Sequence, residues 1–210
     1  MTENDTRQLL VELAGSLFAR GFSVGSAGNI SVRLADGYLI TPTNSSLGRL
    51  DPARLARLDL SFTHIGGDKP SKEVTMHRAF YAARPDAGAV VHLHSTMASA
   101  VACLPDVDAD NPIPPLTPYF VMRIGRSMPV IPYYRPGDAD MEPAIHAAAR
   151  HARAVLLANH GPVVSGQSLT DAVHAAEELE EAAKLFLLLR NMAPRLLSAP
   201  QVGDLLAHFG

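Results

Sequence analysis

Three of the nine histidines have the residue type and spacing that bind a divalent metal. His92 and His94 stand two residues apart, and His160 follows a separate apolar run. In a strand, side chains two apart point to the same face, so His92 and His94 can converge on one cation. Such a pair, taken alone, is as often solvated or packed and hydrogen-bonded. With His160 as a third imidazole, one position on a tetrahedral metal stays open, as in catalytic sites.

Glu73 is the acid that could serve such a site. It stands in Pro70-Ser71-Lys72-Glu73, where a helix is expected to begin, and the positive end of a helix dipole favours a carboxylate there. Close to a metal it could be the resting fourth ligand, then swing away to move a proton. The alternative is an ordinary first-turn glutamate that favours helix formation. The sequence alone leaves both interpretations open.

Segments of small residues could offer backbone N–H groups and hydroxyls to an anion. They are Ser26-Ala27-Gly28-Asn29, Thr43-Asn44-Ser45-Ser46 and Ser71-Lys72, the last at the expected helix N-terminus. None matches a Walker or dinucleotide fingerprint, so a nucleotide-binding fold is not supported. Each segment can equally be a turn. Lys72 adds a positive charge suited to a phosphate or a carboxylate.

The elements that must position these residues alternate irregularly between helices and short strands. Helical periodicity predicts helices over 6–20, 71–84, 141–153 and from 168 onward. Apolar and β-branched runs predict strands over 30–33, 38–41, 87–94 and 154–158, with an edge strand at most over 128–134. The acidic cluster 177–181 of the last helix is expected on a solvated face or at a subunit contact. Prolines and short strands favour mixed or antiparallel pairing in an α/β layered domain.

Length and composition exclude several classes of protein. A chain of 210 residues suits one domain, and 47% hydrophobic residues are too many for a disordered chain. A net charge of −3 gives no electrostatic footprint for nucleic acid. Apolar runs fall far short of the ~20 residues that span a membrane, and the acidic N-terminus is not a signal peptide. The single cysteine, Cys103, excludes an internal disulfide framework and is typical of the reducing cytoplasm.

The sequence resembles the class II aldolase/adducin family in an ordered set of motifs. These are Ala27-Gly28-Asn29-Ile30-Ser31, Leu39-Ile40-Thr41-Pro42-Thr43, Ser71-Lys72-Glu73, Val90-Val91-His92-Leu93-His94 and Asn159-His160-Gly161. The resemblance covers about residues 5–190. It implies a single domain over 1–210, with a three-layer α/β/α fold around a central, mainly antiparallel sheet. It also implies a homotetramer with sites at subunit interfaces.

The resemblance further implies a role for each matching residue. The zinc ligands are His92, His94 and His160, with Mn²⁺ or Co²⁺ as substitutes for Zn²⁺, and the catalytic acid/base is Glu73. The phosphate loops map onto Gly28, Asn29, Thr43, Asn44 and Ser71, and Lys72 stands where fuculose-phosphate-type aldolases carry a second serine. Tyr119 falls where family aldolases place a tyrosine that reaches into a neighbouring subunit's site. A loop aromatic packed at an interface is the alternative for Tyr119.

The segments 67–73, 114–119 and 157–162 are similar to the branch of the family that decarboxylates 3-oxo-tetronate 4-phosphates. For this chain the similarity implies loss of CO2 from a phosphorylated four-carbon sugar acid through a zinc-bound enediolate, giving dihydroxyacetone phosphate. The alternatives are a zinc-dependent sugar-phosphate aldolase, an epimerase or dehydratase, and a non-catalytic adducin-like assembly module. Adducin-like modules lack the metal histidines. The C-terminal stretch 194–210 departs from the family pattern, and its role is open.

Overall fold

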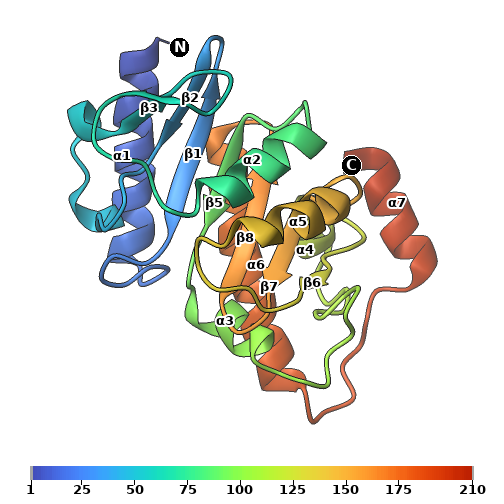
Figure 1. Cartoon of the computed structure of the whole chain (residues 1–210). Helices are drawn as coiled ribbons and strands as arrows, with labels where there is room; N and C mark the ends of the chain where they lie inside the picture. Colours follow the sequence, from blue (N-terminus) through green and yellow to red (C-terminus); the bar gives the residue numbers. More distant parts are fainter. Residues whose placement is uncertain (1, 210) are drawn as a thin grey trace.

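Over residues 2–209, which the computed structural model describes, eight strands form one mixed sheet (Figure 1). The strand order is β4-β3-β2-β1-β5-β8-β7-β6, and every neighbouring pair is antiparallel except β6 and β7. The strands are β1 (Asn29–Leu34), β2 (Gly37–Ile40), β3 (Ala56–Leu58), β4 (His64–Gly66), β5 (Ala89–His92), β6 (Val130–Ile131), β7 (Ala154–Leu157) and β8 (Gly161–Gly166). The expected mixed, mainly antiparallel sheet is thus confirmed.

Helices cover both faces of this sheet. They are α1 (Glu3–Ala19), α2 (Val74–Ala83), α3 (Thr96–Ala102), α4 (Pro118–Ile124), α5 (Glu142–Ala149), α6 (Leu169–Leu189) and α7 (Ala199–Phe209). In Figure 1, α2 and α5 lie in front of the sheet and α6 lies behind it. The expected three-layer α/β/α architecture is confirmed.

The alternation of side chains along β5 and β1 divides the core into two parts. Val91 and Ile30 pack among the buried residues of α1, α3, α4 and α6. Val90 packs on the opposite face, with Phe80 of α2. Because the pattern has period two, His92 follows Val90 onto the α2 face. The polar residues of β1, which alternate with Ile30, face α2 for the same reason. The sheet therefore supplies side chains to one functional face.

Several expected boundaries differ from those observed. The helix expected over 71–84 begins at Val74, and the strand expected over 87–94 ends at His92, because α3 begins at Thr96. The sequence predicts no helix between 84 and 141, yet α4 begins at Pro118, where the Thr117 hydroxyl accepts from the Phe120 N–H at 3.2 Å. The edge strand expected over 128–134 is present as β6, and Ser168 caps α6 as predicted.

The acidic cluster of α6 is less exposed than the sequence predicts. The carboxylate of Glu180 accepts hydrogen bonds from the backbone N–H groups of Met97 and Ala98, each at 2.8 Å, at the start of α3. Glu177 pairs with Arg20, and burial raises the pKa of Glu178. Contacts within the chain half-bury these three side chains, so the fully solvated face expected for them is wrong. The expected subunit contact stays a prediction.

The C-terminal stretch forms a helix of its own. Leu197 donates its N–H to the Pro115 carbonyl at 3.0 Å, and α7, red in Figure 1, follows it. Gly210 lies outside the described residues. Among the helices of residues 2–209, none combines the length and the apolar character that crossing a bilayer demands.

Candidate active site

Four side chains from distant parts of the sequence meet at the end of β5. The Nε2 atom of His94 lies 3.1 Å from Nε2 of His92 and 3.0 Å from Nε2 of His160. The Glu73 carboxylate lies 3.7 Å from Nε2 of His92 and 3.5 Å from Nε2 of His160. One ligand atom from each of the four residues lies within 4.8 Å of all the others. The structure thus brings together the predicted metal ligands and the predicted acid/base.

His160 reaches this cluster from the tight turn between β7 and β8. Asn159 in that turn has φ +56°, a left-handed conformation that asparagine tolerates better than most residues. Gly161 then passes so close to the chain after β5 that a Cβ there would lie 2.4 Å from the Leu93 carbonyl oxygen. Only glycine allows this approach. The hairpin can therefore pack directly against the segment that carries His92 and His94.

The imidazole nitrogens fit a bound divalent cation. Nδ1 of His92 lies 2.9 Å from the Pro162 carbonyl, which only accepts, so a neutral His92 ring keeps a lone pair on Nε2. Zn–N bonds of about 2.0–2.1 Å at tetrahedral angles would separate two imidazole nitrogens by roughly 3.3 Å, close to the observed 3.0 and 3.1 Å. Desolvation also lowers the pKa of His92, His94 and His160. Neutral rings are the form that binds a metal.

Glu73 is buried beside this cluster and held by a neighbour. Its side chain is nearly inaccessible, and its backbone N–H donates to the Ser71 hydroxyl at 3.3 Å. The Asn29 amide nitrogen donates to its Oε2 at 2.7 Å. Asn29 was predicted only as an anion-binding residue, and this contact with Glu73 is an additional finding.

A cavity of about 380 Å³ opens beside Glu73 and His94. It is lined by the residues onto which the family resemblance maps the phosphate loops, together with Lys72: Gly28, Asn29, Thr43, Asn44, Ser71 and Lys72. The backbone at Gly28 lies against β5, since a Cβ there would sit 2.9 Å from the His92 carbonyl oxygen. Lys72 is exposed, and its charge reinforces desolvation in lowering the pKa of His94 and His160. The cavity thus lies between the predicted anion-binding loops and the cluster of Glu73, His92, His94 and His160.

Tyr119 is the one predicted site residue that the structure does not place here. It lies on α4 with 63% of its surface exposed, and it does not line the cavity. An exposed side chain is free to contact another subunit, so its predicted role stays a prediction.

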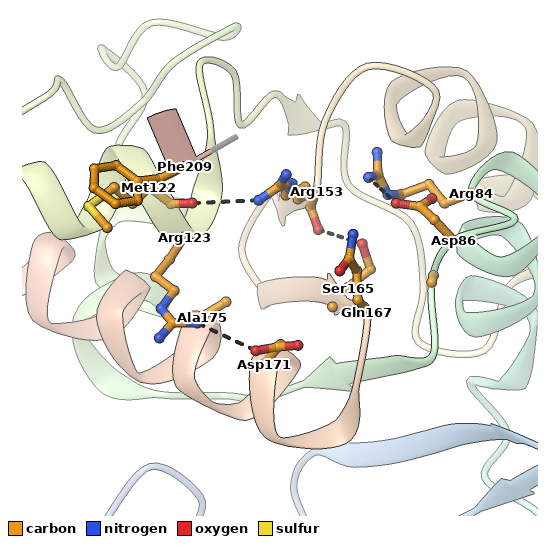
Figure 2. A pocket seen from close by; sticks show the side chains of 12 residues that line it. Arg84, Asp86, Met122, Arg123, Arg153, Ser165, Gln167, Asp171, Ala175 and Phe209 are labelled. Atoms are coloured by element: carbon orange, nitrogen blue, oxygen red, sulfur yellow. Dashed lines mark hydrogen bonds and ion pairs between the residues drawn. The ribbon is translucent and has the colours of Figure 1, made fainter. Parts of the chain in front are cut away.

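A second cavity, of about 370 Å³, lies at the other end of β8 (Figure 2). Gly161 at the start of β8 adjoins His160, whereas Gly166 at its end lines this second cavity. Its arginines already have partners: Arg84 pairs with Asp86 at 3.1 Å and Arg123 with Asp171 at 3.6 Å. Figure 2 also shows Arg153 directed at the Met122 carbonyl, 3.5 Å away. None of its lining residues belongs to the cluster of Glu73, His92, His94 and His160.

Comparison with known proteins agrees with this geometry. Residues 8–187 match the model of the class II aldolase and adducin N-terminal domain. The 3-oxo-tetronate 4-phosphate decarboxylase of Haemophilus influenzae is 50% identical over 206 residues, which cover 98% of each chain. The L-fuculose phosphate aldolase of Escherichia coli O6:H1 is 33% identical over 89% of this chain and 85% of its own.

Comparison with solved structures identifies a relative that is similar over nearly the whole chain. The crystal structure of YgbL from Klebsiella pneumoniae superposes with a TM-score of 0.94 at 49% identity, covering 98% of this chain and 99% of that one. Similarity at this level extends from the N-terminal helix to the C-terminal one. The chain therefore belongs to the class II aldolase and adducin family.

Proposed function

We propose that the chain is a metal-dependent decarboxylase that converts a 3-oxo-tetronate 4-phosphate into dihydroxyacetone phosphate and CO2. The observation that carries this proposal is the cluster of three imidazoles and Glu73 beside a cavity whose mouth carries Lys72. The 50% identity to a decarboxylase of that name, against 33% to an aldolase, favours decarboxylation over aldol cleavage.

The metal ligands are His92, His94 and His160, and the ion is Zn²⁺, with Mn²⁺ or Co²⁺ as substitutes. When bound, such an ion supplies a Lewis acid that stabilises negative charge on substrate oxygens. The chain's own contribution is to keep the three rings neutral by burial and to fix the His92 ring through the Pro162 carbonyl.

The loops around the cavity bind the anionic ends of the substrate. Ser71 and Thr43 supply hydroxyls, while Gly28 and Asn44 shape the loops on either side. Lys72 supplies the positive charge for the phosphate or the departing carboxylate. A substrate that carries both groups is strongly anionic, so this charge favours its binding.

Glu73 supplies the proton that completes the reaction. When the bond to the carboxylate breaks, CO2 leaves and the electron pair stays with the adjacent carbon, which must then be protonated. The Glu73 carboxyl group gives this proton and regains one from solvent. Its bond to Asn29 holds it in place beside the cavity. Tyr119 of a neighbouring subunit, in a homotetramer, is the second candidate for this step.

A sugar-phosphate aldolase is the second candidate function, favoured by the 33% identity to the L-fuculose phosphate aldolase. Both reactions leave an electron pair on the carbon next to a ketone, so the same residues serve either one. The products separate the two: an aldolase releases an aldehyde, and a decarboxylase releases CO2. An adducin-like assembly module would not need the four converging side chains.

The test is a coupled assay on metal-loaded protein. The substrate, 3-oxo-tetronate 4-phosphate, is generated in place, and dihydroxyacetone phosphate is followed with and without a chelator. The His160→Ala variant serves as the matched control for the spontaneous decarboxylation of a β-keto acid. Chelator-sensitive product above that background supports the proposal. No such product from protein that holds its metal would favour the aldolase, and protein that binds no metal would contradict the assignment of the histidines.

A further inference from the structure

Behind Glu73, a chain of buried polar groups runs between α2 and β1. Asn29 donates to Glu73 at 2.7 Å, and its Oδ1 lies 2.5 Å from Nε2 of His77. On the other side of the ring, Nδ1 of His77 lies 2.7 Å from the Ser31 hydroxyl, which lies 2.9 Å from the Tyr81 hydroxyl. All five side chains are buried, and His77 is 0% exposed.

Local geometry explains why these residues meet. Glu73, the N-cap residue of α2, is followed at intervals of four by His77 and Tyr81, so the three side chains lie along one side of the helix. Asn29 and Ser31 are two apart on β1, so they share the face of the sheet that α2 covers. The two rows interleave, and each polar group on one row finds its partner on the other.

The donor and acceptor properties of these groups determine which group donates each hydrogen bond in this buried network. The Asn29 amide presents its NH2 group to Oε2 of Glu73 and its carbonyl oxygen to Nε2 of His77. That oxygen only accepts, so Nε2 of His77 carries the proton. In a neutral ring Nδ1 then accepts from the Ser31 hydroxyl. Burial keeps the ring neutral, because desolvation lowers the pKa of His77 to about 3.

We propose that His77 is a positioning residue for proton transfer by Glu73. Its Nε2–H fixes the orientation of the Asn29 amide, and Asn29 fixes Oε2 of Glu73. The other carboxylate oxygen then stays toward His160 and the cavity. His77 is neither one of the metal ligands His92, His94 and His160 nor a lining residue of the cavity, and its hydrogen bond to the lining goes to Asn29. The inference rests on the proposed function only in taking Glu73 as the proton carrier.

The variants that test this role differ in one hydrogen bond. His77→Leu fills most of the space but cannot donate to Asn29, whereas the amide of His77→Gln can. Phe80→Leu, also on α2 and fully buried, is the matched control for lost packing without a change in the polar chain. Bound metal and thermal unfolding are measured for each variant.

The readout is the exchange of deuterium from D2O into the hydroxymethyl carbon of dihydroxyacetone phosphate. Exchange needs the proton transfer but not the loss of CO2, and its stereochemistry reports whether one group delivers the proton. We expect His77→Leu to lower kcat and the exchange rate about tenfold or more, since a general acid/base contributes roughly 10²–10⁴-fold. KM and bound metal stay near wild type, both faces of the carbon become labelled, and His77→Gln restores most of the rate.

The outcomes separate this role from the proposed function. Wild-type exchange without CO2 release would overturn the decarboxylation and leave the test of His77 valid. A His77→Leu enzyme that exchanges at the wild-type rate on one face would overturn the positioning role, whichever reaction the enzyme catalyses. An equal loss in Phe80→Leu or His77→Gln would also overturn it, because the effect would then come from packing.

Discussion

The buried, neutral His77 makes the stability of the fold depend on pH in a calculable way. In the native state the pKa of His77 is lowered to about 3 by desolvation, against 6.5 for the free side chain. Between these two values the unfolded chain takes up a proton that the native ring does not. Acid therefore favours the unfolded state, and stability attributable to His77 is lost as the pH falls below about 6.5.

The size of the effect follows from the gap between the two pKa values. Each pH unit inside the window changes the free energy of unfolding by about 1.4 kcal/mol. Lowering the pH from about 7.5 to about 4.5 should therefore remove roughly 2.6 kcal/mol through His77 alone. His92, whose pKa is also lowered by burial, adds a slope of its own to the wild type and to the variants alike.

The assay is urea unfolding of metal-free protein at several pH values in this range. We expect the His77→Gln variant to lose less stability than the wild type, by roughly 2.6 kcal/mol across the range. His174→Gln, at an exposed position of α6, controls for the removal of a histidine as such. Parallel curves for wild type and His77→Gln would refute the reasoning, because they would mean that His77 titrates alike in both states.

Three further predictions concern the metal site and the core. Glu73→Gln should keep its bound metal yet lose about 10²-fold or more in turnover, because the amide cannot carry the proton; near-normal turnover in that variant would contradict the role of Glu73. His160→Ala removes one of three imidazoles and should lose its metal on dialysis, as elemental analysis would show, and full retention would mean that another group binds the ion. Phe80→Ala leaves a cavity between α2 and the sheet and should cost about 3–5 kcal/mol in the free energy of unfolding, measured in urea; a loss below about 1 kcal/mol would mean that the site refills.

Local patterns in the sequence predicted much of the fold. The helix starting at Ser168 and the apolar strand of β5 follow from capping and periodicity, and these depend on neighbours in sequence. The start of α4 carried a signal that the surrounding prolines outweighed, since Thr117 and Pro118 form a typical N-cap and first position. The strand β8 was missed because glycine and proline at its start suggest a turn.

The contacts that complete the site depend on partners far away in the sequence. Spacing could suggest that His92 and His94 converge, and local context could offer His160 as a third imidazole and Glu73 as an acid. The family resemblance then assigned their roles. The bond from Asn29 to Glu73 joins residues 44 apart, so no local rule could reveal it. His77 was not singled out as a candidate, yet its interval of four from Glu73 is a usable signal. Glu180 likewise became informative only once α3 was seen to begin beside it.

The separation of the four site residues along the chain has a consequence for biosynthesis. Glu73, His92 and His94 belong to the first half of the chain, whereas His160 arrives with the hairpin that pairs β8 to β5. A nascent chain that lacks this hairpin carries only three of the four side chains, so the complete set of ligand atoms forms only after His160 has been made and β8 has paired with β5.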